Sequence, residues 1–216
     1  MSQPPKLRSD GPPHNPGVRE LIAGKRRWAA PQAKQQDVAK LGFPGWHERG
    51  YLPHRDEPRL TQFVTFHLND SYPATLRVEW EALLKVEDNL ERHHQLEAYL
   101  DKGRGICHLR DPRIAGLVDT AFQFYHRRYF DLRAWVIMPN HVHLLFGMDV
   151  IPLGRIIKQL KQYTAREANK LLRRCGQFWA EDAWDTYMRD AAHELKTRKY
   201  IENNPVKAGL VKTAKD

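Results

Sequence analysis

The chain has 216 residues, with 35 Lys and Arg against 26 Asp and Glu, so its net charge is +9 when histidine is neutral. This length suits one ordinary domain with extensions, and the charge favours a polyanion as partner, nucleic acid before membrane, although a merely basic protein is the alternative. No apolar run reaches the ~20 residues of a membrane span, and two cysteines form no disulfide framework or zinc motif, so we expect a cytoplasmic protein without a membrane partner.

The first 44 residues are rich in proline and polar residues, and we expect residues 1–44 to form a flexible basic segment before one domain at 45–216. An aromatic and basic loop, GWHERGYLPHRDEP, opens that domain. It is either a surface connector or a nucleic-acid contact. The residues that would stack on bases or lie near phosphates are Trp46, His47, Arg49, Tyr51 and Arg55.

The remaining pattern alternates strands and helices. A strand is predicted at 61–68, helical sequence at 73–100, and a helix that begins with Asp111 as N-cap and Pro112 in its first turn. Strands at 129–138 and 141–148 should form a hairpin around Pro139 and Asn140, followed by a helix over 152–174. A short strand at 184–190 and a helix at 191–202 complete an α+β fold, with a mostly antiparallel sheet and helices packed on one face.

Two histidines occupy the second strand of that hairpin, in the stretch MPNHVHLLF. Because strand side chains alternate, His141 and His143 point to one face, about 6 to 7 Å apart along the strand. Two neutral imidazoles at this spacing are able to bind one divalent ion, while the alternative is a solvated strand face. Without a cysteine cluster nearby, an open, catalytic metal site fits better than a closed zinc site.

The helix over 152–174 offers the residues that would complete such a site. Its apolar face, which should pack on the sheet, consists of Leu153, Ile156, Ile157, Leu160, Thr164, Ala168 and Leu171. Tyr163 and Glu167 lie one turn apart at the edge of this face, where a carboxylate needs a cation or hydrogen bonds. Taken singly, Tyr163 is a core tyrosine and Glu167 a partner of Arg or Lys; beside the histidine pair, we interpret them as site residues.

A phenol in such a site has a defined chemistry. Its unperturbed pKa is about 10, but a metal is able to polarise a phosphodiester so that a positioned phenolate attacks it. The product is a phosphotyrosine ester that a free hydroxyl is able to reverse, without any nucleotide cofactor. In agreement, the chain has no P-loop and no dinucleotide-binding glycine motif.

Several motifs in order, AWVIMPNHVHLLF, LKQYTAREANKLL and RKYIENNPVKAGLV, resemble those of the REP-associated tyrosine transposases, within the HUH group of single-strand DNA transposases and nucleases. The similarity extends over residues 45–211. It implies a ferredoxin-like catalytic core and metal-dependent cleavage and rejoining of single-stranded DNA at palindromic repeats that form hairpins.

The resemblance also implies roles for individual residues. His141 and His143 would bind Mg²⁺ or Mn²⁺, Tyr163 would be the nucleophile, and Glu167 the third ligand, with Asn169 as the alternative. Asn140 would bond to the metal shell or phosphate, although a turn role is favoured. The exposed basic residues predicted to contact DNA from the long helix are Lys158, Arg166 and Lys170.

Two other functions stay open from the sequence. One is a catalytically silent module that binds structured single strands, and the other is an unrelated zinc or iron protein. Either a monomer or a homodimer is compatible with the sequence.

Overall fold

The structure is a computed structural model, and it describes residues 40–49, 52–71 and 89–214. Most of the segment 1–44 that we expected to be flexible lies outside these residues, so the domain boundary at residue 45 stays a prediction. Within the described part of the chain, no helix is both long and apolar enough to cross a membrane.

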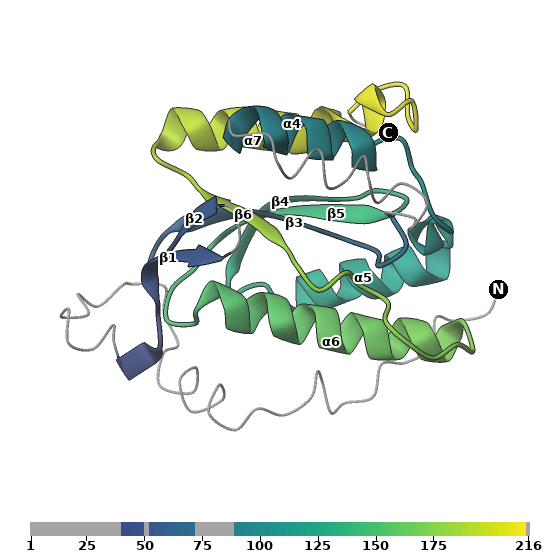
Figure 1. Cartoon of the computed structure of the whole chain (residues 1–216), viewed down its shortest axis with the longest axis horizontal. Coiled ribbons are helices and arrows are strands. Elements are labelled where there is room, and N and C mark those ends of the chain that lie inside the picture. Colours follow the sequence, from purple (N-terminus) through teal and green to yellow (C-terminus); the bar gives the residue numbers. More distant parts are fainter. Residues whose placement is uncertain (1–39, 50–51, 72–88, 215–216) are drawn as a thin grey trace.

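A four-stranded antiparallel sheet forms the centre of the molecule (Figure 1). Its spatial order is β4-β5-β3-β6, and the chain runs β3, α5, β4, β5, α6, β6. This is the order and connection of a ferredoxin-like fold. The α+β class and the antiparallel sheet are thus confirmed. The bounds are β3 Thr61–His67, α5 Pro112–Tyr125, β4 Asp131–Ile137, β5 His141–Gly147, α6 Leu153–Leu171 and β6 Trp184–Tyr187.

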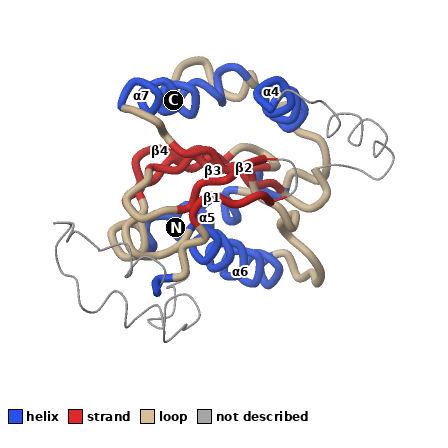
Figure 2. Tube along the Cα trace, turned by 60° about the vertical axis from the view of Figure 1, so that its left-hand side comes forward, coloured by secondary structure: helices blue, strands red, loops and turns tan. Residues whose placement is uncertain are grey.

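Helices cover both faces of this sheet. The helices α5 and α6 pack against each other on one face. On the other side lie α7, Ala191–Lys207, and α4, Asn89–Leu100 (Figure 2). The sequence predicted helices on one face only, and the second layer formed by α7 and α4 corrects that prediction. Its cause is visible in β5, where all seven residues are buried, so both faces of the strand need a cover.

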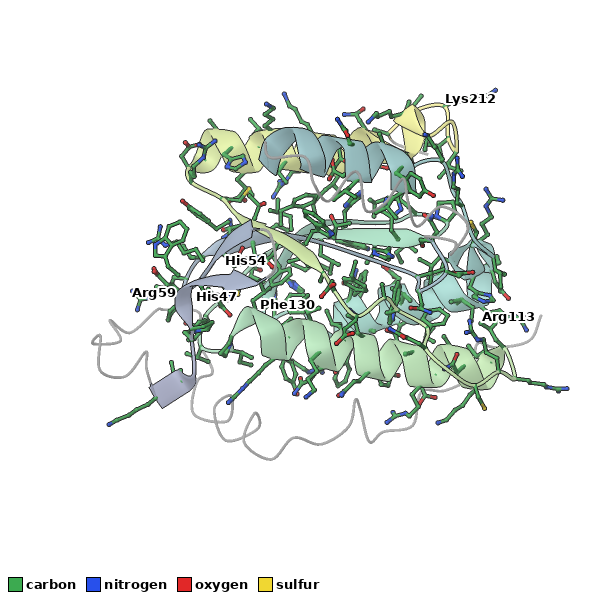
Figure 3. The ribbon with its side chains drawn as sticks, in the orientation of Figure 1. His47, His54, Arg59, Arg113, Phe130 and Lys212 are labelled. Atoms are coloured by element: carbon green, nitrogen blue, oxygen red, sulfur yellow. The ribbon has the colours of Figure 1, made fainter. Side chains whose placement is uncertain are left out.

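The two faces of the sheet differ in composition. Toward α5 and α6 the strands present aliphatic and aromatic side chains, including Val64, Phe66, Val142, Leu144 and Phe146. Phe130, which is fully buried, fills the same layer (Figure 3). Toward α7 the apolar cluster is smaller and consists of Phe63, Ala134, Leu145, Met188 and Ile201. The larger core therefore belongs to α5 and α6, and polar groups gather under α7.

The helix α5 begins as the sequence predicted. The Asp111 side chain accepts a hydrogen bond from the backbone nitrogen of Arg113 at 2.9 Å, and Pro112 occupies the first turn. A short 3-10 turn, η2, His108–Arg110, leads into it. The cap satisfies one amide that the first helical turn leaves without a partner.

The predicted loop GWHERGYLPHRDEP is a two-stranded hairpin instead. Strands β1, Gly45–Arg49, and β2, Leu52–Asp56, pair antiparallel, and Figure 3 shows His47 and His54 on this hairpin. The buried His54 ring contacts Asp185 of β6 at 2.8 Å and so attaches the hairpin to the edge of the sheet. Polar strand residues such as these conceal the alternation that sequence patterns use.

Gly105, in the segment that follows α4, has a backbone conformation and a close contact that favour glycine. Its φ is +88°, and a Cβ atom there would lie 2.6 Å from the backbone oxygen of Asp70. We expect Gly105→Ala to lower the free energy of unfolding by about 2 kcal/mol, because a strained backbone adds to a steric clash. Gly116→Ala in α5 is the matched control, since nothing lies within 4 Å of its added Cβ. Urea unfolding should show a loss for the first variant only, and equal midpoints would contradict this account.

Candidate active site

The histidine pair lies on the side of the sheet that faces α7. Both rings are fully buried, and their cross-strand partners on β3 are His67 for His141 and Thr65 for His143. The intervening Val142 belongs to the core under α5 and α6. The predicted strand and the predicted common face of the two histidines are both confirmed.

Each imidazole is held by its Nδ1 atom. In His141, Nδ1 contacts Asn140 Oδ1 at 2.8 Å, and in His143 it contacts the Thr65 hydroxyl at 2.7 Å. Because the Asn140 amide nitrogen donates to the Arg104 carbonyl, its oxygen faces His141 and accepts the Nδ1 proton. The Nε2 atoms of the two rings then face each other across 3.2 Å.

Burial keeps His141 uncharged. It lowers the pKa of His141 to about 3, and the charge at His67 adds to this effect. A neutral imidazole with Nδ1 protonated carries its lone pair on Nε2. The Nε2 atom of His141 therefore carries a lone pair at neutral pH, as a metal ligand would require.

The helix α7 brings an amide and a phenol to the histidines. The Asn204 side chain lies 3.2 Å from His143 Nε2, and its nitrogen donates to the Tyr200 hydroxyl at 3.0 Å. The Tyr200 and His143 ring centres are 5.5 Å apart. Tyr200 and Asn204 are four residues apart, so they occupy one side of the helix. This pair was not among the residues predicted from the sequence.

Two carboxylates approach from α4 and its end. Asp101 Oδ1 lies 3.8 Å from His141 Nε2, and its Oδ2 lies 3.5 Å from the Lys207 ammonium of α7. Glu97, one turn earlier, is buried. Burial first, and then the charges of Glu97 and Asp101, raise the pKa of Tyr200 far above its ordinary value.

The donor set fits a divalent ion in two respects. Two nitrogens that bind one ion at about 2.1 Å each would lie about 3 Å apart, close to the observed 3.2 Å between the Nε2 atoms. The Asn204 Oδ1 atom is buried and accepts no hydrogen bond from any described residue. A half turn of the amide would direct this oxygen toward His143. Hard cations such as Mg²⁺ and Mn²⁺ accept an amide oxygen as ligand.

Residues 40–49, 52–71 and 89–214 contain no group of three His, Cys, Asp or Glu side chains placed to hold a metal. Beside the two histidines, Asn204 offers an amide as a further polar group.

The structure does not bring Tyr163 and Glu167 to the histidines, which corrects the three-part site predicted from the sequence. The helix α6 covers the opposite face of the sheet, where Tyr163 is 8% exposed and belongs to the large core. The Arg166 guanidinium lies 5.7 Å above its ring. The physical reason is that the apolar side of α6 packs on the apolar face of β5, and strand alternation places the histidines on the other face.

Glu167 has cationic partners of its own on the surface of α6. Arg166 Nε and Lys170 Nζ lie 2.7 and 3.0 Å from its Oε1 atom. Burial acts to raise the pKa of Glu167, but these hydrogen bonds outweigh it and hold the pKa below its ordinary value. Asn169, the alternative third ligand, donates to the Gly176 carbonyl at 2.9 Å and lies on the same distant helix. Both side chains therefore have structural roles here.

The residues predicted to contact DNA lie in separate parts of the structure. Trp46 is 57% exposed, and the Arg55 guanidinium lies 5.6 Å from its ring and 5.2 Å from that of Tyr187. His47 contacts the Gly45 carbonyl, the Arg49 side chain is not described, and Tyr51 lies outside the described residues. This exposed group lies on β1, β2 and β6, and its contact with DNA stays a prediction.

The remaining predicted contacts do not border the histidines. Lys158, Arg166 and Lys170 are exposed on α6, across the sheet from them. Asn140 is fully buried and orients His141, so as folded it presents no surface to DNA. Exposed basic residues on the histidine side, which the sequence did not single out, include Lys102, Lys199 and Lys207.

The fold and the site define a ferredoxin-like α+β domain in which a histidine pair, an amide and a phenol meet under the last helix. The profile of the family described as "Transposase IS200 like" matches residues 114–204, which include β5, Tyr163, Tyr200 and Asn204. Residues 114–204 are thus similar to that family, in agreement with the transposase resemblance of the sequence motifs.

Two solved structures are also similar to this chain. One is a REP-associated tyrosine transposase bound to a REP hairpin, 18% identical, with a TM-score of 0.45 and coverage of 78% of this chain and 76% of that one. The other, from Deinococcus radiodurans R1 and proposed to be a transposase, is 18% identical, with a TM-score of 0.33 and coverage of 73% and 96%. No curated protein matches the chain.

Proposed function

We propose that the protein is a metal-dependent single-stranded DNA endonuclease and strand transferase that acts at hairpin-forming repeats through a tyrosine nucleophile. The observation that carries the proposal is the contact between Tyr200, Asn204 and the histidine pair under α7. The family match and the net charge of +9 support DNA as the substrate. The resemblance of the sequence motifs to the REP-associated tyrosine transposases supports single-stranded DNA with hairpin-forming repeats as the substrate.

The proposed reaction forms one ester and breaks another. The Tyr200 hydroxyl oxygen attacks a phosphorus atom of the DNA backbone, and the bond from phosphorus to the 3′ oxygen breaks. The products are a 5′-phosphotyrosine ester and a free 3′-hydroxyl. Because the ester stores the bond energy, a 3′-hydroxyl is able to reverse the step without a nucleotide cofactor.

His141, His143 and Asn204 would hold a Mg²⁺ or Mn²⁺ ion, which when bound polarises the scissile phosphate. Asn140 and Thr65 keep each imidazole in one orientation, and the Asn204 amide lies beside both His143 and the Tyr200 hydroxyl. Glu167, Asn169 and Tyr163 have no part in this proposal, since α6 lies across the sheet.

The experiment uses the full chain with a DNA hairpin that carries single-stranded flanks. A label at the 3′ end should move with the protein on a denaturing gel, whereas a label at the 5′ end should appear on a shorter free strand. Both products should need Mg²⁺ or Mn²⁺ and vanish with EDTA. A fully duplex DNA of the same sequence is the control. Tight, salt-sensitive binding without an adduct under either metal would instead favour the silent binding module.

Asn140 offers a test of the metal site that does not depend on cleavage. We expect Asn140→Ala to weaken Mn²⁺ binding about 10- to 100-fold, because outer partners fix the orientation of a ligating imidazole. Isothermal titration calorimetry with Mn²⁺ measures the effect, and Asn169→Ala is the matched control on α6. An unchanged affinity in Asn140→Ala, or an equal loss in the control, would speak against the site.

A further inference from the structure

The hairpin of β1 and β2 carries an exposed aromatic side chain that the family match leaves unassigned. The matched segment begins at residue 114, whereas Trp46 lies on β1. Trp46 is 57% exposed, although tryptophan side chains are highly buried on average. An indole that stays in water at this cost needs an explanation of its own, and its neighbours provide one.

Trp46 belongs to a group of three side chains from three strands, Trp46, Arg55 and Tyr187, which we call the aromatic platform. The Trp46 and Tyr187 rings meet edge to face with their centres 5.7 Å apart. The Arg55 guanidinium lies 5.6 Å from the Trp46 ring and 5.2 Å from the Tyr187 ring, and it donates to Glu57 at 3.0 Å. Because ring pairs and cations over rings attract each other, these contacts hold the exposed indole in place.

The hairpin under the platform is anchored to the rest of the fold at two points. The buried His54 ring contacts Asp185 of β6 at 2.8 Å. The buried Asp56 carboxylate accepts a hydrogen bond from the backbone nitrogen of Leu153, at the start of α6, at 3.1 Å. A binding surface built on anchored strands loses little conformational freedom when a ligand stacks on it.

The surroundings of the platform are positively charged. Arg59 and Arg189 are exposed in the segments that follow β2 and β6, and Arg59 lies at the hairpin end of the molecule (Figure 3). The two segments are adjacent, since the Met188 nitrogen donates to the Thr61 carbonyl at 2.8 Å. The three carboxylates named above are already held by an arginine, a histidine and a backbone amide. The platform therefore favours an anionic ligand with flat rings, and a single-stranded nucleic acid, whose base faces are open, combines the two.

We propose that Trp46 is a stacking site for one unpaired base in the single-stranded flank of the DNA hairpin, an inference that rests on the proposed function for its substrate. Gln62 pairs with Tyr187 and Thr65 with His143, so the platform and the histidine site are about 10 Å apart along β3. One DNA strand is able to reach both. Since every base has a flat face, the site accepts any base and adds affinity rather than sequence specificity.

The test measures affinity by fluorescence anisotropy of a labelled hairpin with single-stranded flanks, in EDTA, so that neither metal binding nor cleavage contributes. We expect Trp46→Ala to weaken binding about 5- to 150-fold, as the loss of one stacked base does. Trp46→Phe keeps a ring and should lose less than about fivefold. Trp135→Ala is the matched control, because this indole is 37% exposed on β4, at the opposite edge of the sheet, and it should bind within about threefold of wild type.

An abasic scan of the flank separates stacking from a general loss of binding. Removal of the base at one position should weaken wild-type binding about as much as Trp46→Ala does, and the same abasic DNA should bind Trp46→Ala as well as intact DNA does. Binding by Trp46→Ala within about threefold of wild type, or abasic losses that persist in this variant, would overturn the inference. If the stacking result holds but no adduct forms with Mn²⁺, only the proposed cleavage fails.

Discussion

The variant Tyr200→Phe should form no covalent adduct with hairpin DNA, a loss of at least about 10³-fold in single-turnover rate, because the attacking oxygen is gone. Tyr163→Phe should react within about threefold of wild type, since its ring is buried across the sheet from the histidines. Denaturing gels with 3′-labelled DNA and Mn²⁺ measure both. The two variants remove the same atom from two different helices.

Comparing Tyr200→Phe with Tyr163→Phe also separates loss of the nucleophile from loss of DNA binding or folding. Both variants should bind the hairpin as tightly as wild type, and both should unfold cooperatively, since Phe fills nearly the same volume as Tyr. An adduct that persists in Tyr200→Phe and disappears in Tyr163→Phe would restore the assignment that the sequence suggested and reject the present one.

The variant His143→Ala should weaken Mn²⁺ binding by more than about 100-fold, because it removes a ligand and leaves the Asn204 amide without its neighbour. Glu167→Ala, which removes the third ligand predicted from the sequence, should bind Mn²⁺ as wild type does. Electron paramagnetic resonance of free Mn²⁺ during titration measures both affinities.

The opposite ranking, a loss in Glu167→Ala with unchanged binding in His143→Ala, would contradict the site described here. Stoichiometric zinc that resists EDTA in the purified protein would favour the unrelated metalloprotein instead. The structure places Glu167 in surface ion pairs, and its removal should therefore change stability by less than about 1 kcal/mol.

Local patterns in the sequence predicted local structure well. The alternation in WVIMPNHVHLLF predicted the β4–β5 hairpin and the common face of His141 and His143. The pair Asp111 and Pro112 marked the start of α5. These features depend on neighbours in the chain, so a single sequence contains the information.

The helix α6 covers a face of the sheet that its own sequence does not specify. Its periodicity placed Tyr163 at the buried edge correctly, but a helix wheel does not say which side of the sheet the helix reaches. The signal was present in β5, where Val142 and Leu144 alternate with the histidines. An apolar helix face packs on the apolar strand face, and this places α6 away from the imidazoles.

The remaining part of the site lies on the last helix, α7, which extends farther than the sequence predicted. The stretch NNPVKAGL suggested a helix end near Glu202, because proline removes a backbone donor and rarely sits inside a helix. The helix α7 instead continues through Pro205 to Lys207. The four-residue spacing of Tyr200 and Asn204, which equals that of Tyr163 and Glu167, was the signal that could have identified them.

The most direct test of the site is the identity of the tyrosine that carries DNA. The trapped adduct is digested with trypsin and nuclease, and the nucleotide-bearing peptide is sequenced by mass spectrometry. Cleavage after Lys and Arg places Tyr200 in YIENNPVK and Tyr163 in QYTAR, so the two peptides differ clearly in mass. We predict the nucleotide on Tyr200 in YIENNPVK, and a nucleotide on Tyr163 would contradict this account.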